Sequence, residues 1–231
     1  MKIQITCDDY GLSPSINQAI INLAELEKIS SISILSTHVS KKDLYNLQNI
    51  SDKVFFGLHF NLTESKEGKI NFPKILLMSR KKILKSFKEQ YYFLKDHNIN
   101  IKYYDSHHHI HYLPHIQNSI SEFVNVNKIR TRNLNFHHPR TVKYKTIKAI
   151  NKLNKKINNH ITDGSIINFS EKYFEIPYIE NSTYELITHP SLNNNTTKDS
   201  LLRKEEYLQL KSFDWKDNKI RLINATEFFN D

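Results

Sequence analysis

The sequence predicts an α/β domain whose sheet is mainly parallel. Short apolar runs of strand length alternate with helical or polar segments along the whole chain of 231 residues, which is the pattern of repeated β–α units. Several of these runs are followed directly by Asp, His or Arg, and in such folds the chemistry gathers at the carboxyl ends of the strands. No repeat or interdomain linker interrupts the pattern, so we expect residues 1–231 to form one domain.

The first strand and the first helix have the clearest signals. Lys2–Cys7 is rich in isoleucine and alternates loosely, as a buried strand does. Ser13 can then cap a helix, and Pro14 suits its first position, where a missing N–H costs nothing. An apolar face follows at spacings of three, four and seven residues, which predicts an amphipathic helix: Ile16, Ala19, Ile20 and Leu23.

The later elements are predicted from the same signals. One long helix is expected over Lys74–His97 and another after Pro114, whereas 189–200 is typical of a polar loop. The further strands are expected at 31–35, 53–62, 101–104, 128–131, 165–169, 184–188 and 219–222.

Composition limits the classes of function. The formal net charge is +9, and most of it lies on what we expect to be solvated helix faces. This charge also suits a phosphate-bearing substrate or an anionic membrane surface, whereas no nucleic-acid-binding module is recognisable. The single Cys7 excludes an internal disulfide, and no apolar run is long enough for a membrane helix. We expect a cytoplasmic protein, with peripheral contact at the inner membrane face as a further option.

Two carboxylates end the first predicted strand. Adjacent strand residues point to opposite sides, so one of Asp8 and Asp9 could bind a metal ion while the other stays near it as a base. A simpler interpretation is that one of them only caps the following turn. His59 lies in the third predicted strand, where an isolated histidine is more often a core residue than a ligand. Gly57 beside it permits close backbone approach.

Five of the twelve histidines lie in YYDSHHHIHYLPHI, residues 103–116. If this stretch is extended, Asp105, His107, His109 and His111 share one face. Crowded imidazoles repel one another when protonated, and a divalent cation resolves that conflict. Only some can be direct ligands. The others would orient the ligands or meet substrate, and Asp105 could accept the second N–H of a ligating ring. A histidine-rich surface tract without a role is the alternative.

Two further side chains complete the candidate site. His189 follows another apolar run and precedes Pro190, and Arg130 ends a short predicted strand. Each is weak evidence alone, because an isolated arginine is usually a surface residue. Together with the Asp8–Asp9 pair and the two other histidine sites, they indicate a mixed Asp/His/His metal site with open positions for water and a substrate oxygen. That arrangement is typical of a hydrolase.

The motifs also resemble those of a known family. CDDYGLS, GLHFNLT, DSHHHIH followed by LP, and THP are similar, in order and approximate spacing, to the motifs of the YdjC/ChbG-like carbohydrate deacetylases. Members of that family are metal-dependent enzymes that remove acetyl groups from N-acetylated amino sugars, and their fold resembles an irregular (β/α) barrel. The similarity spans Asp8 to Pro190. Three positions depart from the usual forms: Cys7 replaces Ala, Tyr10 replaces Phe, and Ser191 replaces the Gly after the late His-Pro.

The resemblance implies roles for particular residues. Three would bind the metal ion: Asp9, His59 and His107. Asp8 would take a proton from the attacking water, His189 would deliver a proton to the leaving amine, and Arg130 would stand behind the base. Three polar side chains of the histidine stretch are left as candidates for substrate binding: Asp105, His109 and His111.

The resemblance also implies partners. The cofactor would be one divalent cation, and the ligand set does not choose between magnesium and zinc. The substrate would be an acetamido sugar, either in a soluble oligosaccharide or carried on polyprenyl phosphate or another glycolipid, which the positive charge favours.

Two other classes remain open from the residues alone. One is a metal-loaded carbohydrate-binding protein without turnover, which would not need a base such as Asp8 beside its metal. The other is a metal-dependent phosphoesterase, which usually wants a second metal and more carboxylates. The oligomeric state is left open, with a homodimer as one option.

Overall fold

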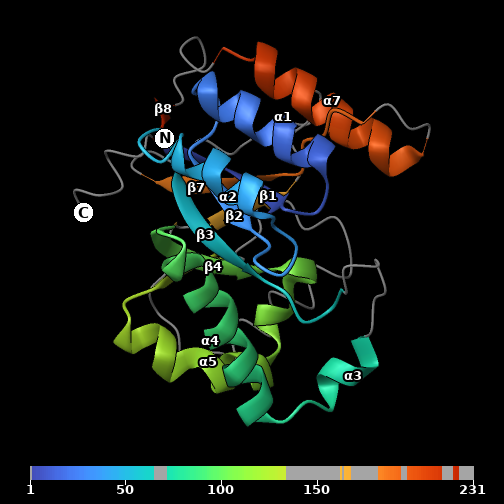
Figure 1. The fold of residues 1–231 in the computed structure, drawn as a ribbon. Helices are drawn as coiled ribbons and strands as arrows, with labels where there is room; N and C mark the ends of the chain where they lie inside the picture. Colours follow the sequence, from blue (N-terminus) through green and yellow to red (C-terminus); the bar gives the residue numbers. More distant parts are fainter. Residues whose placement is uncertain are drawn as a thin grey trace.

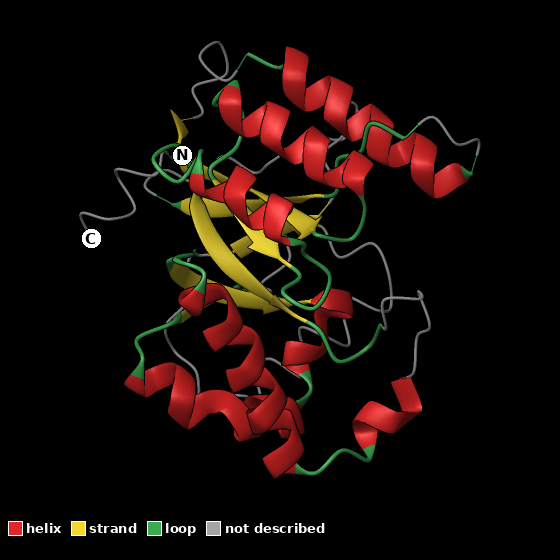
Figure 2. Ribbon diagram, in the orientation of Figure 1, coloured by secondary structure: helices red, strands yellow, loops and turns green. Residues whose placement is uncertain are grey.

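The described strands form one parallel sheet that is curled into an irregular half-barrel (Figures 1 and 2). The computed structural model describes residues 2–64, 72–133, 162, 164–167, 182–193, 197–214 and 221–223. The strand order is β5-β4-β3-β2-β1-β7-β6, with β8 pairing with β1, so the predicted class is confirmed. The strands are β1 (Lys2–Tyr10), β2 (Ser31–Ile34), β3 (Phe55–Phe60), β4 (Ile101–Ser106), β5 (Arg130–Thr131), β6 (Gly164–Ile167), β7 (Thr183–Thr188) and β8 (Arg221–Leu222).

Helices cover the sheet in two groups. In Figure 1, α1 and α7 lie above the sheet, α2 lies in front of it, and α4 and α5 pack side by side below it. The expected helix over Lys74–His97 is in fact two helices, because the helical conformation is interrupted at 77–79. The helices are α1 (Pro14–Glu25), α2 (Lys41–Gln48), α3 (Phe72–Leu76), α4 (Arg80–Asp96), α5 (Pro114–Val126) and α7 (Lys198–Ser212), with a 3-10 helix, η1, at His107–Tyr112.

The start of α1 forms as predicted. Ser13 has an extended backbone, and its side-chain oxygen accepts a hydrogen bond from the N–H of Ile16. This bond satisfies one of the four free N–H groups that every helix start leaves. Parts of the expected strands at 165–169 and 219–222 lie outside the described residues.

The two faces of β1 have different tasks. Ile3, Ile5 and Cys7 are buried in the apolar core, whereas the residues between them point into the barrel. There Thr6 donates a hydrogen bond to Glu185 Oε1 over 2.7 Å. The alternation in the first strand therefore places apolar side chains in the core and polar ones inside the barrel.

The register of the sheet gathers the polar strand ends at one edge. His59 of β3 is paired with Asp105 of β4, and Cys7 of β1 is paired with Thr188 of β7. Because all pairings are parallel, the residues after these positions emerge on the same side of the barrel. This is where the residues expected to carry the chemistry meet.

Gly57 allows one close contact that supports this edge. Its pairing partner is Tyr103, and a Cβ atom added at Gly57 would lie 2.2 Å from that ring. The Tyr103 hydroxyl is 2.7 Å from Ser33 Oγ, and Ser33 donates to Asp105 over 2.6 Å. The glycine thus makes room for a ring that holds a site carboxylate through Ser33.

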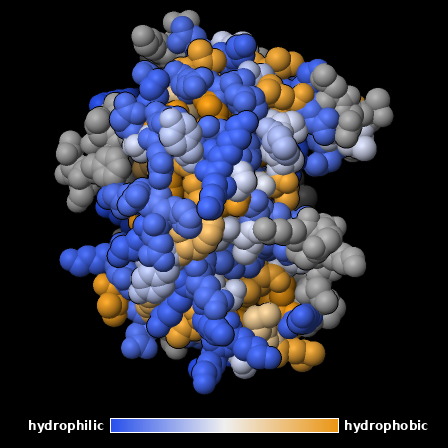
Figure 3. Space-filling view, in the orientation of Figure 1, coloured by the Kyte–Doolittle hydropathy of each residue, from blue (hydrophilic) through white to orange (hydrophobic). Residues whose placement is uncertain are grey.

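The surface of the viewed face is mostly polar (Figure 3). Within the part of the chain that the structure describes, no helix has both the length and the apolar character needed to cross a bilayer.

Replacing Gly57 with alanine should destabilise the fold, because the new methyl group overlaps the Tyr103 ring. We expect the free energy of unfolding to fall by about 1–3 kcal/mol in urea denaturation. The double variant with Tyr103→Leu should recover part of this loss, since the smaller side chain leaves room. A loss of unfolding free energy in the double variant equal to the sum of the losses in the two single variants would contradict the proposed contact.

Candidate metal centre and active site

Three side chains from three chain segments converge at the carboxyl edge of the sheet. Asp9 Oδ1 lies 3.0 Å from His107 Nδ1 and 3.3 Å from His59 Nε2, and the two nitrogens are 3.3 Å apart. All three residues are buried. Asp9 has a left-handed backbone with φ 68°, a conformation that Asp tolerates better than most residues.

The outer nitrogens of both imidazoles are bonded to carboxylates. His59 Nδ1 donates to Asp105 Oδ1 over 2.7 Å, and His107 Nε2 donates to Glu64 Oε2 over 2.7 Å. These bonds leave the inner nitrogens with lone pairs that face Asp9. Three electron-rich atoms that meet this closely need a proton or a cation between them.

The separations match those of ligands on one metal ion. Donor atoms about 2.1 Å from a shared cation lie about 3.0–3.4 Å from each other, and the observed separations are 3.0–3.3 Å. A set of one carboxylate and two imidazoles can hold zinc or a similar divalent ion. The donor set therefore fits one divalent cation.

Without a cation, a proton takes this place. Burial lowers the pKa of His59, but Asp105 and Asp8 raise it by more, and the result is a pKa of about 10. Burial raises the pKa of Asp9, yet its bonds from His107 and His59 bring it well below the usual range. A cation must then displace a proton from His59, so its binding should release protons.

Arg132 organises the carboxylates behind this cluster. Its Nη1 and Nη2 atoms donate to the two oxygens of Asp8, each over 2.7 Å. Nη2 also lies 2.5 Å from Asp105 Oδ2, and Nε lies 3.0 Å from Glu185 Oε1. Burial raises the pKa of Asp8, but Arg132, His59 and His189 together lower it by more, so the net pKa lies well below the ordinary value. Asp8 is therefore held ionised.

The expectation for Arg130 is corrected by this geometry. The guanidinium that contacts Asp8 belongs to Arg132, whereas Arg130 lies in β5, paired with Tyr103. Residues two apart share one side of an extended chain, so alternation alone could not distinguish the two arginines. The choice depends on where β5 ends relative to the barrel interior.

The buried charges also favour a cation. Four buried carboxylates, those of Asp8, Asp9, Asp105 and Glu185, face two guanidinium groups. The second guanidinium is that of Arg203, whose Nη2 lies 2.9 Å from Asp9 Oδ2. With neutral histidines, two formal negative charges remain. The partly buried carboxylate of Glu64, bonded to His107, adds a further negative charge. A divalent cation would offset most of this excess, and unpaired buried charge is costly.

The histidine stretch is not extended, which corrects that expectation. β4 ends at Ser106, and His108 and His109 both have φ 56° within η1. His107 therefore joins the cluster, while His108 turns to Thr63, with Nδ1 and Oγ1 2.8 Å apart. The single face proposed for alternate residues of this stretch does not exist.

Two of the three residues expected to bind substrate are buried too deeply to contact it. Asp105 is fully buried behind His59, where it accepts the second N–H of the ring. His111 is fully buried too, with Nδ1 2.5 Å from Ser106 Oγ. Neither side chain reaches the surface to meet a substrate, whereas His109 is half-buried.

His189 lies beside Asp8, as the order of the strands predicts. Its Nε2 is 3.9 Å from Asp8 Oδ2, and its side chain is 25% exposed. The backbone N–H of His189 donates to Glu206 Oε2 over 2.7 Å, which fixes the loop after β7. An imidazole that is open to solvent on one side and faces a buried carboxylate on the other can exchange protons with a bound molecule.

Three polar residues of the site were missed by sequence reasoning: Glu64, Arg132 and Arg203. Glu64 is brought to His107 by a turn in which Asn61 Oδ1 accepts from the N–H groups of Thr63 and Glu64. An Asn that bonds its own following backbone is a recognisable turn signal. Arg203 comes from the middle of α7, and no strand-end signal marks it.

The fold and the donor set thus define a (β/α) barrel with a candidate cation site at the carboxyl edge of its sheet. The chain belongs to the YdjC-like protein family, whose profile matches residues 2–218. No curated protein sequence matches the chain.

Two solved structures are similar in fold. One is a protein of Enterococcus faecalis V583 named for cellobiose-phosphate cleavage, with 16% identity, 98% coverage of both chains and a TM-score of 0.73. The other is a family 4 acetyl xylan esterase from Clostridium thermocellum in complex with a cobalt ion, with 12% identity, coverage of 100% of this chain and 91% of that chain, and a TM-score of 0.52. At these identities the likeness supports the fold, an irregular (β/α) barrel.

Replacing Arg132 with methionine should cost about 3–5 kcal/mol of unfolding free energy, because three buried carboxylates lose their cation. Urea denaturation followed by circular dichroism measures the loss. The matched control is Arg130→Met, which removes a half-buried arginine two residues away and should cost less than about 1 kcal/mol. Equal losses in the two variants would contradict the central place given to Arg132.

Replacing His107 with alanine should remove divalent cation binding, because one member of the donor triangle formed by Asp9, His59 and His107 is lost. Calorimetric titration with Zn²⁺ measures this, and repeating it in buffers of different ionisation enthalpy counts protons. For the unmodified protein we expect about one proton released at pH 8, since the pKa of His59 lies above that pH. His109→Ala is the control from the same turn. Unchanged zinc affinity in His107→Ala would contradict the site.

Proposed function

We propose that the protein is a metal-dependent hydrolase that removes the N-acetyl group from an acetamido sugar and releases acetate. Family membership and the shared barrel support a carbohydrate deacetylase. The observation that carries the proposal is the donor triangle of Asp9, His59 and His107 with an ionised Asp8 next to it in the chain. Binding alone needs no second carboxylate beside the cation.

In this proposal Asp9, His59 and His107 hold the divalent cation. Such an ion, when bound, polarises a carbonyl oxygen and makes a neighbouring water more acidic. Asp105 and Glu64 keep the two imidazoles turned toward the site through their hydrogen bonds. The identity of the ion, magnesium or zinc, is left to experiment.

Asp8 is assigned the role of the base. It accepts the proton of the water that attacks the acetyl carbonyl carbon. Arg132 keeps Asp8 ionised and fixes both of its oxygens. Each oxygen retains a further lone pair with which to accept the proton.

His189 is assigned the role of general acid. As the C–N bond breaks, the amine of the sugar needs a proton, which His189 Nε2 would donate. Its partial exposure and its position 3.9 Å from Asp8 would let one bound group lie beside both side chains and contact each of them. After one turnover Asp8 carries an additional proton and His189 lacks one. Transfer of a proton from Asp8 to His189 would return both residues to their starting states.

A metal-dependent phosphoesterase is the less favoured alternative. Such enzymes commonly hold two ions about 4 Å apart, and the cluster of Glu64, His107 and His108 could supply a second position only by sharing His107. The choice between soluble and lipid-linked acetamido sugars, and peripheral contact with an anionic membrane, stay proposals.

Replacing Asp8 with asparagine should lower kcat for acetate release by about 10²–10⁴-fold, because the base is lost while the shape is kept. Acetate is measured with N-acetylated sugar oligomers and lipid-linked acetamido sugars, after loading with Mg²⁺ or Zn²⁺. Cation binding should persist in this variant. Asp52→Asn, at an exposed position, is the control. Release of phosphate in place of acetate would contradict the proposal and support a phosphoesterase.

A further inference from the structure

Arg203 lies within the candidate site, and the chemistry proposed above gives it no role. It comes from the second turn of α7, and 19% of its side chain is exposed. Its Nη2 donates to Asp9 Oδ2 over 2.9 Å, whereas Asp9 Oδ1 lies near His59 and His107. The two oxygens of this candidate ligand are therefore divided between the cation position and a guanidinium group.

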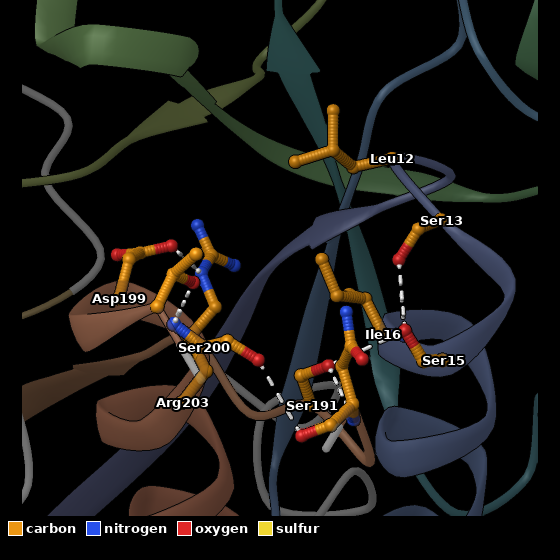
Figure 4. A pocket seen from close by; sticks show the side chains of 10 residues that line it. Leu12, Ser13, Ser15, Ile16, Ser191, Asp199, Ser200 and Arg203 are labelled. Atoms are coloured by element: carbon orange, nitrogen blue, oxygen red, sulfur yellow. Dashed lines mark hydrogen bonds and ion pairs between the residues drawn. The ribbon is translucent and has the colours of Figure 1, made fainter. Parts of the chain in front are cut away.

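Neighbouring groups hold the guanidinium in this place. Its Nε donates to Asp199 Oδ2 over 3.1 Å, one turn earlier on α7. Figure 4 shows these two side chains together at the wall of a polar cavity between α1 and α7. The backbone carbonyl of Arg203 accepts from the N–H of Ser191 over 3.1 Å, in the loop after β7. A planar group bonded on two edges has little freedom to turn away from Asp9.

The same side of α7 also positions the loop that carries His189. Glu206, three residues after Arg203, accepts from the backbone N–H of His189 over 2.7 Å. Residues three apart lie on one face of a helix, so α7 presents Arg203 to Asp9 and Glu206 to the His189 loop. The contact between Arg203 and Asp9 is thus part of the packing of α7 against the carboxyl edge of the sheet.

The number of oxygens that Asp9 supplies decides how many positions on a bound cation stay open. With two imidazoles and one carboxylate oxygen, a four-coordinate ion keeps one position for water or a carbonyl oxygen. If Asp9 supplied both oxygens, the same three residues would fill all four positions. The hydrogen bond from Arg203 fixes the plane of the carboxylate and reduces the negative charge that Oδ2 can offer to an ion.

Arg203 also lowers the affinity of the site for any cation. A guanidinium group is charged at every ordinary pH, and here it is bonded to one of the candidate ligands. Like charges this close repel one another strongly where little water screens them. A protein that only had to hold the ion would gain from a neutral residue at this position, so the arginine is better explained by what the bound ion must do.

We propose that Arg203 is a positioning residue that restricts Asp9 to one ligating oxygen and so keeps a position on the divalent cation open for the reacting water. The proposal rests on the proposed function for its purpose, but its effect on the cation is measurable without a substrate. Arg203 acts through Asp9 and not on the reacting atoms.

Replacing Arg203 with methionine tests this proposal first by cation binding. We expect Zn²⁺ to bind at least about tenfold tighter in calorimetric titration, because the repulsion is removed and Asp9 can offer both oxygens. The visible absorption of the Co²⁺-loaded protein should weaken, since the bands of Co²⁺ lose intensity as its coordination number rises. Arg203→Lys keeps the charge and should retain the weaker binding. Lys211→Met removes an exposed charge from the same helix, and we expect no change in that control.

Turnover is the second measurement. With saturating Zn²⁺, kcat for acetate release should fall at least about tenfold in Arg203→Met, because the open position is lost. Arg203→Lys should recover part of it. Tighter binding together with slower turnover distinguishes positioning from a merely structural role, because a loss of packing would weaken both. Thermal melts check folding, and Arg203→Gln repeats both measurements with a neutral polar side chain should the methionine variant not fold.

The outcomes separate this proposal from the proposed function. Zn²⁺ binding that is unchanged or weaker in the neutral variants would overturn the role of Arg203, and so would tighter binding with unchanged turnover. If the unmodified protein releases no acetate from any sugar, the proposed function fails. Tighter binding and a higher coordination number in Arg203→Met would then still support the restriction of Asp9 to one oxygen.

Discussion

The buried guanidinium of Arg132 is the interaction on which the site depends. It joins Asp8 of β1, Asp105 of β4 and Glu185 of β7, so one side chain spans the barrel interior from strand to strand. Three carboxylates packed this closely would repel one another without it, and each would favour its protonated form. With Arg132 in place, the pKa of Asp8 stays low and Asp105 can accept the N–H of His59. The electronic state of the candidate metal ligands therefore follows from a residue that does not touch them.

The polar interior of the barrel and the apolar core between the sheet and its helices have separate roles. Ile3 and Ile5 lie in the apolar core, which supplies most of the stability that burial can provide. The inward residues Gln4 and Thr6 of the same strand form hydrogen bonds with the neighbouring strands β2 and β7, so their burial is tolerated. Such networks are rigid when complete, and rigidity is what a site of fixed geometry requires. The partly exposed His189 lies at the edge of this network, where solvent reaches it.

Local signals in the sequence were enough to find the fold class and to place polar residues at the strand ends, whereas the choice of Asp9, His59 and His107 as the three metal ligands came from the resemblance to the family. Strand ends carry polar residues, and the order Asp9, His59, His107 follows from parallel strands whose ends share one edge. Arg132 was missed in favour of Arg130 because both positions satisfy the same alternation. Glu64 and Arg203 were missed because their contacts depend on a turn and on helix packing across the barrel. The extended form expected for the histidine stretch failed at His108 and His109, whose left-handed backbone no spacing rule announces.

Cation binding by one carboxylate and two imidazoles can be measured by X-ray absorption at the metal edge of the cobalt-loaded protein. We expect scattering from two imidazole rings and from oxygen, all at about 2.0–2.2 Å. A sulfur scatterer from Cys7, which lies buried on the other face of β1, or a spectrum without imidazole would contradict it.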